Sequence, residues 1–342
     1  MNLPAPPDLD SLLPRWGEWI ASNALRDCSS ESMQAAMVGA GEDAATAAAL
    51  IQQVLHSPIL TAARRLQQQH QKLLSVVGNL QAVWEAAADY EAVERREQIE
   101  PEEFQRRHIE GFRPLLLSGH ARHWPALQRW QFEALRERFG AQEVQIQSGR
   151  DQDARFEENS EALRRQVSFA EFLHYAQHSA PGNAQYLTAN NHLLRRPEFA
   201  ELLDDVGELP PLVDRAQLAS QAHLWIGPGG TNTPMHHDCC MLFHTQIVGA
   251  KRWRLISPLD WGRMDNRHHV FSPIDLDAPN LLDRHPQFRG ARVLDVTVQP
   301  GETLFLPLGW WHQVSGLAPS VSISYTGMSC PNSFQYFSPR LD

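Results

Sequence analysis

The stretch Thr233-Pro-Met-His-His-Asp238 contains the pattern on which the interpretation of this chain depends. In a β-strand, residues i and i+2 face the same side, so we expect His236 and Asp238 to project together and His237 to point away. An imidazole and a carboxylate on one face can supply two ligands to a divalent metal ion. A third ligand should come from another strand, and His312 is the best candidate because it follows a predicted strand and turn.

Two histidines and one carboxylate leave three coordination positions open, which suits non-haem Fe(II) and its chemistry with O2. Each sign is weak by itself, because most HxD triplets are incidental and a lone histidine after two tryptophans is more often structural. Their joint occurrence predicts a metal site formed by His236, Asp238 and His312.

Short strand-like segments separated by glycine and proline turns lie on both sides of this stretch. Residues 242–256 are predicted to hold two strands that are divided at Gly249-Ala250. Many short strands with such turns are typical of an antiparallel sandwich or barrel. Apolar or alternating residues favour further strands over residues 114–117, 142–147, 186–187, 223–226, 292–298, 303–306 and 321–325.

The first part of the chain shows helical rather than strand periodicity. Because the composition changes near residue 93, we predict a helical N-terminal domain over residues 1–93 and a second, β-rich domain over residues 94–342. The helical domain is expected to pack on the larger one, or else to serve dimerisation or partner binding. An apolar stripe at helical spacing is formed by Leu66, Leu73, Leu74, Val77 and Leu80.

Bulk composition restricts the class of protein. The chain has 342 residues, 42% of them hydrophobic, and it lacks the run of about 18 apolar residues that would predict a membrane span. A net charge of -10 argues against tight binding to nucleic acid, whose phosphates attract basic surfaces. The four cysteines lack CxxC spacing, and the N-terminus lacks a secretory signal pattern. We therefore expect a cytoplasmic protein with no membrane or nucleic-acid partner.

Several segments together resemble one known family. They are residues 224–238, 243–252, 272–275 and 300–312, with residues 113–117 and 124–125 upstream. On these motifs the chain resembles the JmjC/cupin-like Fe(II)- and 2-oxoglutarate-dependent oxygenases. Within that family it is most similar to the subgroup of factor inhibiting HIF, an asparaginyl hydroxylase, and related JmjC protein hydroxylases. The resemblance implies a mainly β fold with α: a double-stranded β-helix of the jelly-roll or cupin type, with flanking helices and an N-terminal helical domain.

The resemblance also assigns roles to individual residues. It implies that His236, Asp238 and His312 bind Fe(II), with 2-oxoglutarate and O2 as cosubstrates. Lys251 occupies the place of the lysine that pairs with the far carboxylate of 2-oxoglutarate. That role is physically sensible, because a buried carboxylate needs a paired charge. Without the family, Lys251 would be interpreted as a surface lysine after a hairpin glycine.

Further positions in the cosubstrate site agree with the family only in part. Thr233 and Tyr186 match hydroxyl donors to the same carboxylate, with a turn-stabilising threonine and a core tyrosine as the structural alternatives. Leu242 and Ser324 fall where the asparaginyl hydroxylase has asparagines. Ser324 can keep one hydrogen bond to the cosubstrate, whereas Leu242 can keep none.

The resemblance implies a dioxygenase that hydroxylates a protein or peptide side chain and releases succinate and CO2. Two alternatives keep the site chemistry: N-methyl demethylation, which would release formaldehyde, and hydroxylation of a small molecule in a biosynthetic pathway. Another alternative is a non-catalytic cupin-type binding protein with the helical region as its interface, although such a protein need not keep the three ligands and Lys251. A homodimer, if formed, is expected to use the N-terminal helices.

Overall fold

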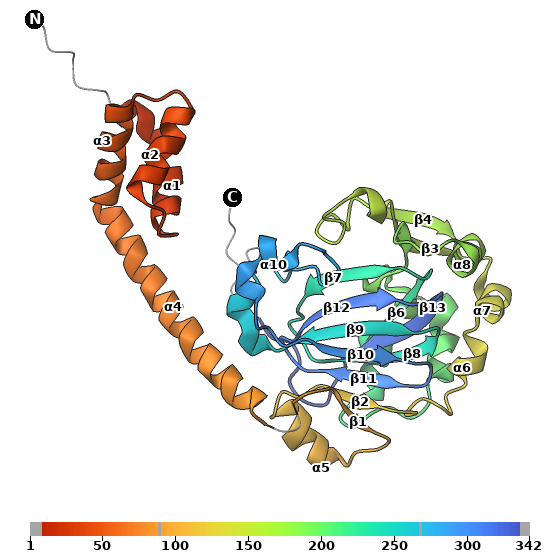
Figure 1. Ribbon diagram of the computed structural model, residues 1–342. Coiled ribbons are helices and arrows are strands. Elements are labelled where there is room, and N and C mark those ends of the chain that lie inside the picture. Colours follow the sequence, from red (N-terminus) through yellow and green to blue (C-terminus); the bar gives the residue numbers. More distant parts are fainter. Residues whose placement is uncertain (1–8, 88–89, 267–268, 336–342) are drawn as a thin grey trace, which may run out of the picture. The chain divides into compact units, whose positions relative to one another are not determined.

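The computed structural model describes residues 9–87, 90–266 and 269–335 (Figure 1). They belong to two compact units, Met1–Asn79 and Leu80–Asp342. The predicted boundary near residue 93 lies beyond the end of the long helix that runs from the first unit into the second. Within the described ranges, no helix has both the length and the hydropathy needed to cross a bilayer.

The first unit is helical, as predicted. A small core of buried side chains, including Ile20, Met37 and Leu50, holds its helices together. Polar side chains start two of these helices, because Ser29 accepts the backbone N–H of Ser32 and Asp43 accepts that of Thr46. The helices are α1 (Leu9–Ala24), α2 (Ser30–Gly39), α3 (Ala44–Leu55) and α4 (Pro58–Glu85), whose last turns belong to the second unit.

The second unit contains three sheets. Their strand orders are β1-β2-β11-β8-β13-β6, β10-β9-β12-β7 and β4-β3-β5. The first sheet is mixed, since β1 and β2 are parallel while its other pairs are antiparallel. The strands are β1 (Glu94–Arg96), β2 (Leu115–Leu117), β3 (Glu143–Ser148), β4 (Arg164–Ser168), β5 (Gln185–Tyr186), β6 (Ala222–Gly227), β7 (Asn232–His236), β8 (Leu242–Val248), β9 (Lys251–Ile256), β10 (Leu294–Val298), β11 (Thr303–Leu306), β12 (Trp311–Gly316) and β13 (Ser320–Tyr325).

Two apolar layers cover the faces of the six-stranded sheet. Leu304 and Leu306 of β11 pack with Trp253 and Leu255 of β9, so this layer lies between the two larger sheets. Phe305 points to the opposite face, as strand alternation requires, and packs in a core with residues of the helices. The α-helices of the second unit are α5 (Pro101–Phe104), α6 (Ala126–Arg129), α7 (Phe132–Phe139), α8 (Phe169–His178), α9 (Leu218–Gln221) and α10 (Leu281–Arg284).

The strand predictions are largely confirmed, with three strands missed, β1, β4 and β12. β4 escaped because its first three residues, Arg164, Arg165 and Gln166, are all polar. β12 escaped prediction because its polar residues His312 and Gln313 are buried, which hides the strand pattern. β1 escaped because all three of its residues, Glu94–Arg96, are charged. The expected predominance of strand over α-helix holds only for the second unit, since the first unit is entirely helical.

The turn between β8 and β9 provides a test of the fold. Gly249 has a φ of +69°, and a Cβ at this position would lie 2.3 Å from the carbonyl oxygen of Pro319. Gly249→Ala should therefore destabilise the protein by about 2–4 kcal/mol, as seen for strained backbone substitutions. Urea unfolding followed by tryptophan fluorescence measures this change. In Gly182→Ala, where the nearest atom is 3.9 Å away, the change should stay within about 0.5 kcal/mol. Equal stability of the two variants would contradict the turn geometry.

Candidate metal centre

Strand pairing in the four-stranded sheet brings two of the three predicted ligands together. β12 runs antiparallel to β7, and His312 lies opposite His236, with ring centroids 4.0 Å apart. The sequence pattern predicted that Asp238 would lie in the same strand as His236. In the structure it lies two residues beyond the end of β7 instead. The chain after β7 nevertheless directs its carboxylate to the histidines, because ligand atoms of all three residues lie within 4.8 Å of one another.

Backbone carbonyl groups fix the orientation of both imidazole rings. Nδ1 of His236 donates to the carbonyl oxygen of Pro234 at 2.8 Å, and Nδ1 of His312 donates to that of Trp310 at 3.0 Å. Since a carbonyl can only accept, Nδ1 carries the hydrogen and Nε2 keeps its lone pair for a metal ion. Nε2 of His312 lies 3.7 Å from a carboxylate oxygen of Asp238.

Burial keeps His312 neutral. Its enclosure, together with the neighbouring His236, holds the pKa of His312 well below its usual value. The ring also stacks on Trp253, with 5.5 Å between ring centroids. A proton therefore competes little with a metal ion for this nitrogen near neutral pH. Two imidazole nitrogens and one carboxylate form a donor set that fits Fe(II) and leaves room for further ligands.

A cavity of about 210 Å³ adjoins the ligand residues. His236, Asp238 and His312 all line it, so the structure brings together every residue that the sequence singled out for the site. The predicted cosubstrate residues also line the cavity: Tyr186 from β5, Thr233 from β7, Lys251 from β9 and Ser324 from β13.

Lys251 places a buried cation in this cavity. Its side chain is only 2% exposed, and Nζ donates to the hydroxyl oxygens of Tyr186 and Ser322, each at 2.9 Å. In the described ranges, no carboxylate lies within ion-pair distance of Nζ, and burial lowers the pKa of Lys251 to about 7. A ligand carboxylate would provide the missing counter-charge, because a buried ammonium group is stable only when paired.

Comparison with protein-family models matches residues 101–326 to the cupin-like domain. The chain belongs to this family.

Several curated relatives of this cupin-like chain carry JmjC or demethylase names. It is 27% identical to Lysine-specific demethylase 8 of Xenopus tropicalis, over 66% of this chain and 50% of that protein. It is 29% identical to Jumonji C domain-containing protein 5 of Drosophila melanogaster, over 66% of this chain and 57% of that protein. A shorter match covers 30% of this chain and 23% of HSPB1-associated protein 1 of Bos taurus, and the two are 41% identical there. The chain spans about half the length of the first two relatives.

The predicted resemblance is thus confirmed for the cupin-like family and its JmjC members. The relatives do not single out the asparaginyl hydroxylase subgroup. Leu242 and Ser324, the two positions that depart from that subgroup, both line the cavity of about 210 Å³, which is the smaller of two cavities in this unit that bear on the site. Leu242 presents an apolar side chain there, whereas the hydroxyl oxygen of Ser324 accepts a hydrogen bond from the indole N–H of Trp225 at 2.8 Å.

Three further residues in or beside this cavity, Ser322, Trp225 and His244, were not predicted from the sequence. Ser322 accepts a hydrogen bond from Lys251, and its position two residues before Ser324 on a predicted strand was the signal that could have revealed it. Trp225 also lines the cavity, with its ring 5.7 Å from Nζ of Lys251. His244 lines it as well, and burial together with Lys251 lowers the pKa of this histidine to about 3, so it is neutral.

Gly227, at the end of β6, allows the ring of Tyr186 to take its place. A Cβ at residue 227 would lie 2.6 Å from Cδ2 of Tyr186 and 2.7 Å from Cγ2 of Thr231. Real Cβ atoms do not approach other atoms so closely, so a larger residue would displace one of these side chains. Both the tyrosine ring and its bond to Lys251 therefore depend on this glycine.

Cys240, two residues after Asp238, also lines the cavity of about 210 Å³. Burial raises the pKa of Cys240 to about 12, with the carboxylate of Asp238 adding to the effect. Its sulfur is therefore a protonated thiol at neutral pH, which acts as a small and weakly polar side chain. The neighbouring Cys239 is half-buried as well.

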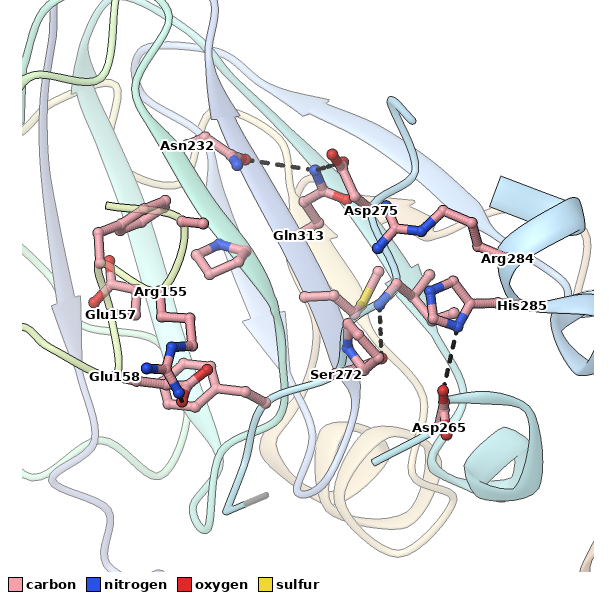
Figure 2. Close-up of a pocket in the computed structure, with 17 residues that line it drawn as sticks. Arg155, Glu157, Glu158, Asn232, Asp265, Ser272, Asp275, Arg284, His285 and Gln313 are labelled. Atoms are coloured by element: carbon pink, nitrogen blue, oxygen red, sulfur yellow. Dashed lines mark hydrogen bonds and ion pairs between the residues drawn. The ribbon is translucent and has the colours of Figure 1, made fainter. Parts of the chain in front are cut away.

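A larger cavity, of about 870 Å³, lies on the other face of the β7–β12 pair (Figure 2). Gln313 lines it, whereas His312 and Val314 line the smaller cavity, as strand alternation requires. One wall is formed by residues 154–158 and another by residues 271–275. This second wall begins where the chain pairs with the outer edge of β7, beside His236.

Polar side chains converge on this larger cavity. The amide of Gln313 donates to the carboxylate of Asp275 at 3.0 Å, and Nδ1 of His285 donates to Asp265 at 3.2 Å (Figure 2). Arg284 and Asn232 also contribute to its lining. A cavity of this size, with charges of both signs, can accept an extended polar ligand rather than a small apolar one.

Removal of a ligand side chain tests the metal centre. In both His312→Ala and Asp238→Ala, we expect the affinity for Fe(II) to fall at least roughly 100-fold, which exceeds the loss typical of an outer-shell partner. Anaerobic equilibrium dialysis followed by metal analysis measures the affinity. The matched control is His174→Ala, an exposed histidine of α8 that lines neither cavity and should leave binding unchanged. Undiminished Fe(II) binding in both ligand variants would refute the site.

Proposed function

We propose that this chain is an Fe(II)- and 2-oxoglutarate-dependent dioxygenase that hydroxylates a protein or peptide side chain and releases succinate and CO2. The observation that carries the proposal is the buried ammonium of Lys251 in the cavity that the three ligand residues also line. A non-catalytic cupin-type protein has no need of an unpaired buried cation beside a metal site. The proposal includes the interpretation of β6 to β13 as a double-stranded β-helix, since these strands alternate between the two larger sheets except at β9 and β10.

The hydroxyl groups around Lys251 are arranged to bind a carboxylate. The hydroxyl oxygen of Tyr186 accepts from Nζ, so its own hydrogen remains available for a ligand oxygen. Burial raises the pKa of Tyr186, which keeps that hydrogen in place at neutral pH. Thr233 of β7 offers a further hydroxyl in the wall of the same cavity. We infer that these three side chains hold the far carboxylate of 2-oxoglutarate.

Fe(II), when bound, supplies the positions at which 2-oxoglutarate and O2 react. The chain contributes orientation through the ring nitrogens of His236 and His312, each fixed by a backbone carbonyl. It also limits the access of water, because Trp225, Leu242 and Trp253 line much of the cavity. Exclusion of water strengthens the pairing of Lys251 with a carboxylate and protects reactive species from side reactions.

A protein or peptide substrate is favoured by the names of the relatives. Two relatives are named as a lysine-specific demethylase and a Jumonji C domain-containing protein. The first name supports N-methyl demethylation as the second candidate, and release of formaldehyde would distinguish it from hydroxylation.

Turnover of 2-oxoglutarate tests the proposed function. The purified protein with Fe(II), ascorbate and O2 should form succinate, measured by mass spectrometry. In Lys251→Met, which keeps the length but removes the charge, affinity for 2-oxoglutarate should fall roughly 10–100-fold, because charge-assisted hydrogen bonds worth about 1.5–3 kcal/mol are lost. Binding of Fe(II) should persist in that variant.

The same substitution at an exposed lysine, Lys72→Met, is the matched control and should not change turnover. Equal affinity of Lys251→Met and the wild type for 2-oxoglutarate would contradict the cosubstrate role of Lys251. If neither Fe(II) nor 2-oxoglutarate bound to the wild type, the non-catalytic alternative would replace the proposal.

The pH dependence of binding provides an independent test. Because the pKa of Lys251 is about 7 in the free protein, the ammonium form is lost as the pH rises above that value. Affinity for 2-oxoglutarate should therefore be constant at lower pH and decrease above it, by up to about tenfold per pH unit. In Lys251→Arg the guanidinium stays charged, so residual binding should lose this dependence. Calorimetric titrations with 2-oxoglutarate across this pH range would detect the decrease in affinity. If the affinity of the arginine variant fell with pH as steeply as that of the wild type, Lys251 would be ruled out as the cause.

A further inference from the structure

α4 carries a row of exposed aliphatic side chains along its whole length. The helix has 28 residues, more than any other in the part of the chain that the structure describes. Four side chains of the row are spaced seven residues apart. Two more lie three residues after the third and the fourth of these. The row consists of Ile59, Leu66, Leu73 and Leu80, which are 83%, 67%, 61% and 56% exposed, with Val76 and Val83, which are 50% and 74% exposed.

This spacing is that of a coiled-coil seam. Residues 59, 66, 73 and 80 occupy the first core position of four consecutive heptads, and Ala62, Gln69, Val76 and Val83 occupy the second. A helix that packs on a globular surface instead shows a broader apolar stripe with a period of 3.6 residues. The narrow row with a period of 3.5 residues is therefore suited to contact with another helix.

A different face of α4 packs within the first unit. Leu60, one residue after Ile59, is only 2% exposed. Gln67, one residue after Leu66, donates a hydrogen bond to the carbonyl oxygen of Leu25 at 2.6 Å. The face that is used inside this unit is thus about 100° around the helix from the exposed row, which is left for another partner.

We propose that this row forms a parallel, two-stranded coiled coil with α4 of a second copy of this chain. A seam of four heptads requires a partner helix of equal length, and the next longest helix in the described residues, α1, has only 16 residues. Burial of the six side chains on both helices, with the stems of Arg65 and Lys72, would remove roughly 1,000 Å² from water, which is near the lower limit for a specific interface. The dimer should therefore dissociate measurably on dilution.

Charge favours the parallel orientation. In a parallel pair, Arg65 lies opposite His70 of the partner subunit and Lys72 lies opposite Val77 of the partner subunit, so no two permanent cations meet. In an antiparallel pair the two copies of Lys72 would face each other near the centre of the seam. Gln69 meets its own copy in the parallel register, and a single polar core pair of this kind fixes the alignment at some cost in stability.

The oligomeric state of the full chain tests the proposal. Sedimentation equilibrium over a concentration series should show a dimer of the 38.7 kDa chain. In Leu66→Lys with Leu73→Lys, the dissociation constant should rise roughly 100-fold or more, because two ammonium groups from each copy would be buried in the seam. The matched control is Gln68→Lys with Gln71→Lys, which adds the same charge to exposed positions outside the seam and should leave the dimer intact. Circular dichroism verifies that all variants remain folded.

Two further variants examine the seam itself. Gln69→Leu should lower the dissociation constant about tenfold, because it replaces the polar core pair by an apolar one. In a Cys28→Ser background, Leu73→Cys should form a disulfide across the parallel seam on oxidation, whereas Ser75→Cys should not. A chain that is monomeric at every concentration, or a dimer that both lysine pairs affect equally, would overturn the proposal. A dimer in which Leu73→Cys does not cross-link would overturn the parallel orientation.

Discussion

The antiparallel pairing of β7 with β12 is the constraint on which the site depends. It places His236 opposite His312, and it contains a register shift that sets Thr233 opposite Val314. In a regular strand, residues three apart face opposite sides, so Thr233 and His236 would be separated. The irregularity adds one residue to β7 and turns both side chains into the same cavity. The register shift in the ladder therefore brings a candidate metal ligand and a candidate hydroxyl donor into one cavity.

The same sheet also positions the cation. β9 pairs with the other edge of β12, so Lys251 lies opposite Gly316 at one end of the ladder and Leu255 lies opposite His312 near the other. His312 and Lys251 are thus held by adjacent strands. The distance between their side chains is set by their positions along the paired strands rather than by flexible loops. The free protein carries the cost of a cation surrounded by hydroxyls and aromatic rings. Such a cost is typical of binding sites, where stability is given up for an interaction that only the ligand completes.

Residue type and spacing near predicted strands were sufficient to single out His236 and His312 in the sequence, whereas Lys251 was assigned only through the family resemblance. Residue type and spacing were not sufficient to find β12, because burial of polar residues is decided by tertiary partners that local pattern does not show. The stripe predicted on the fourth helix mixed Leu66 and Leu73, which are exposed, with Leu74 and Val77, which are half-buried. Periodicity reveals that a helix has an apolar side, but not which part of it the rest of the chain covers.

The close approach of Gly227 to Tyr186 has a consequence for selectivity among dicarboxylic acids. In the proposed cosubstrate site, the distance between the candidate metal ligands and the hydroxyl of Tyr186 would set the length of the diacid that can bridge them. Because the tyrosine ring rests against the hydrogen of Gly227 rather than a methyl group, this length is controlled by a backbone position behind the ring. An added methyl would displace the ring and would therefore change the length of the keto acid that the site prefers.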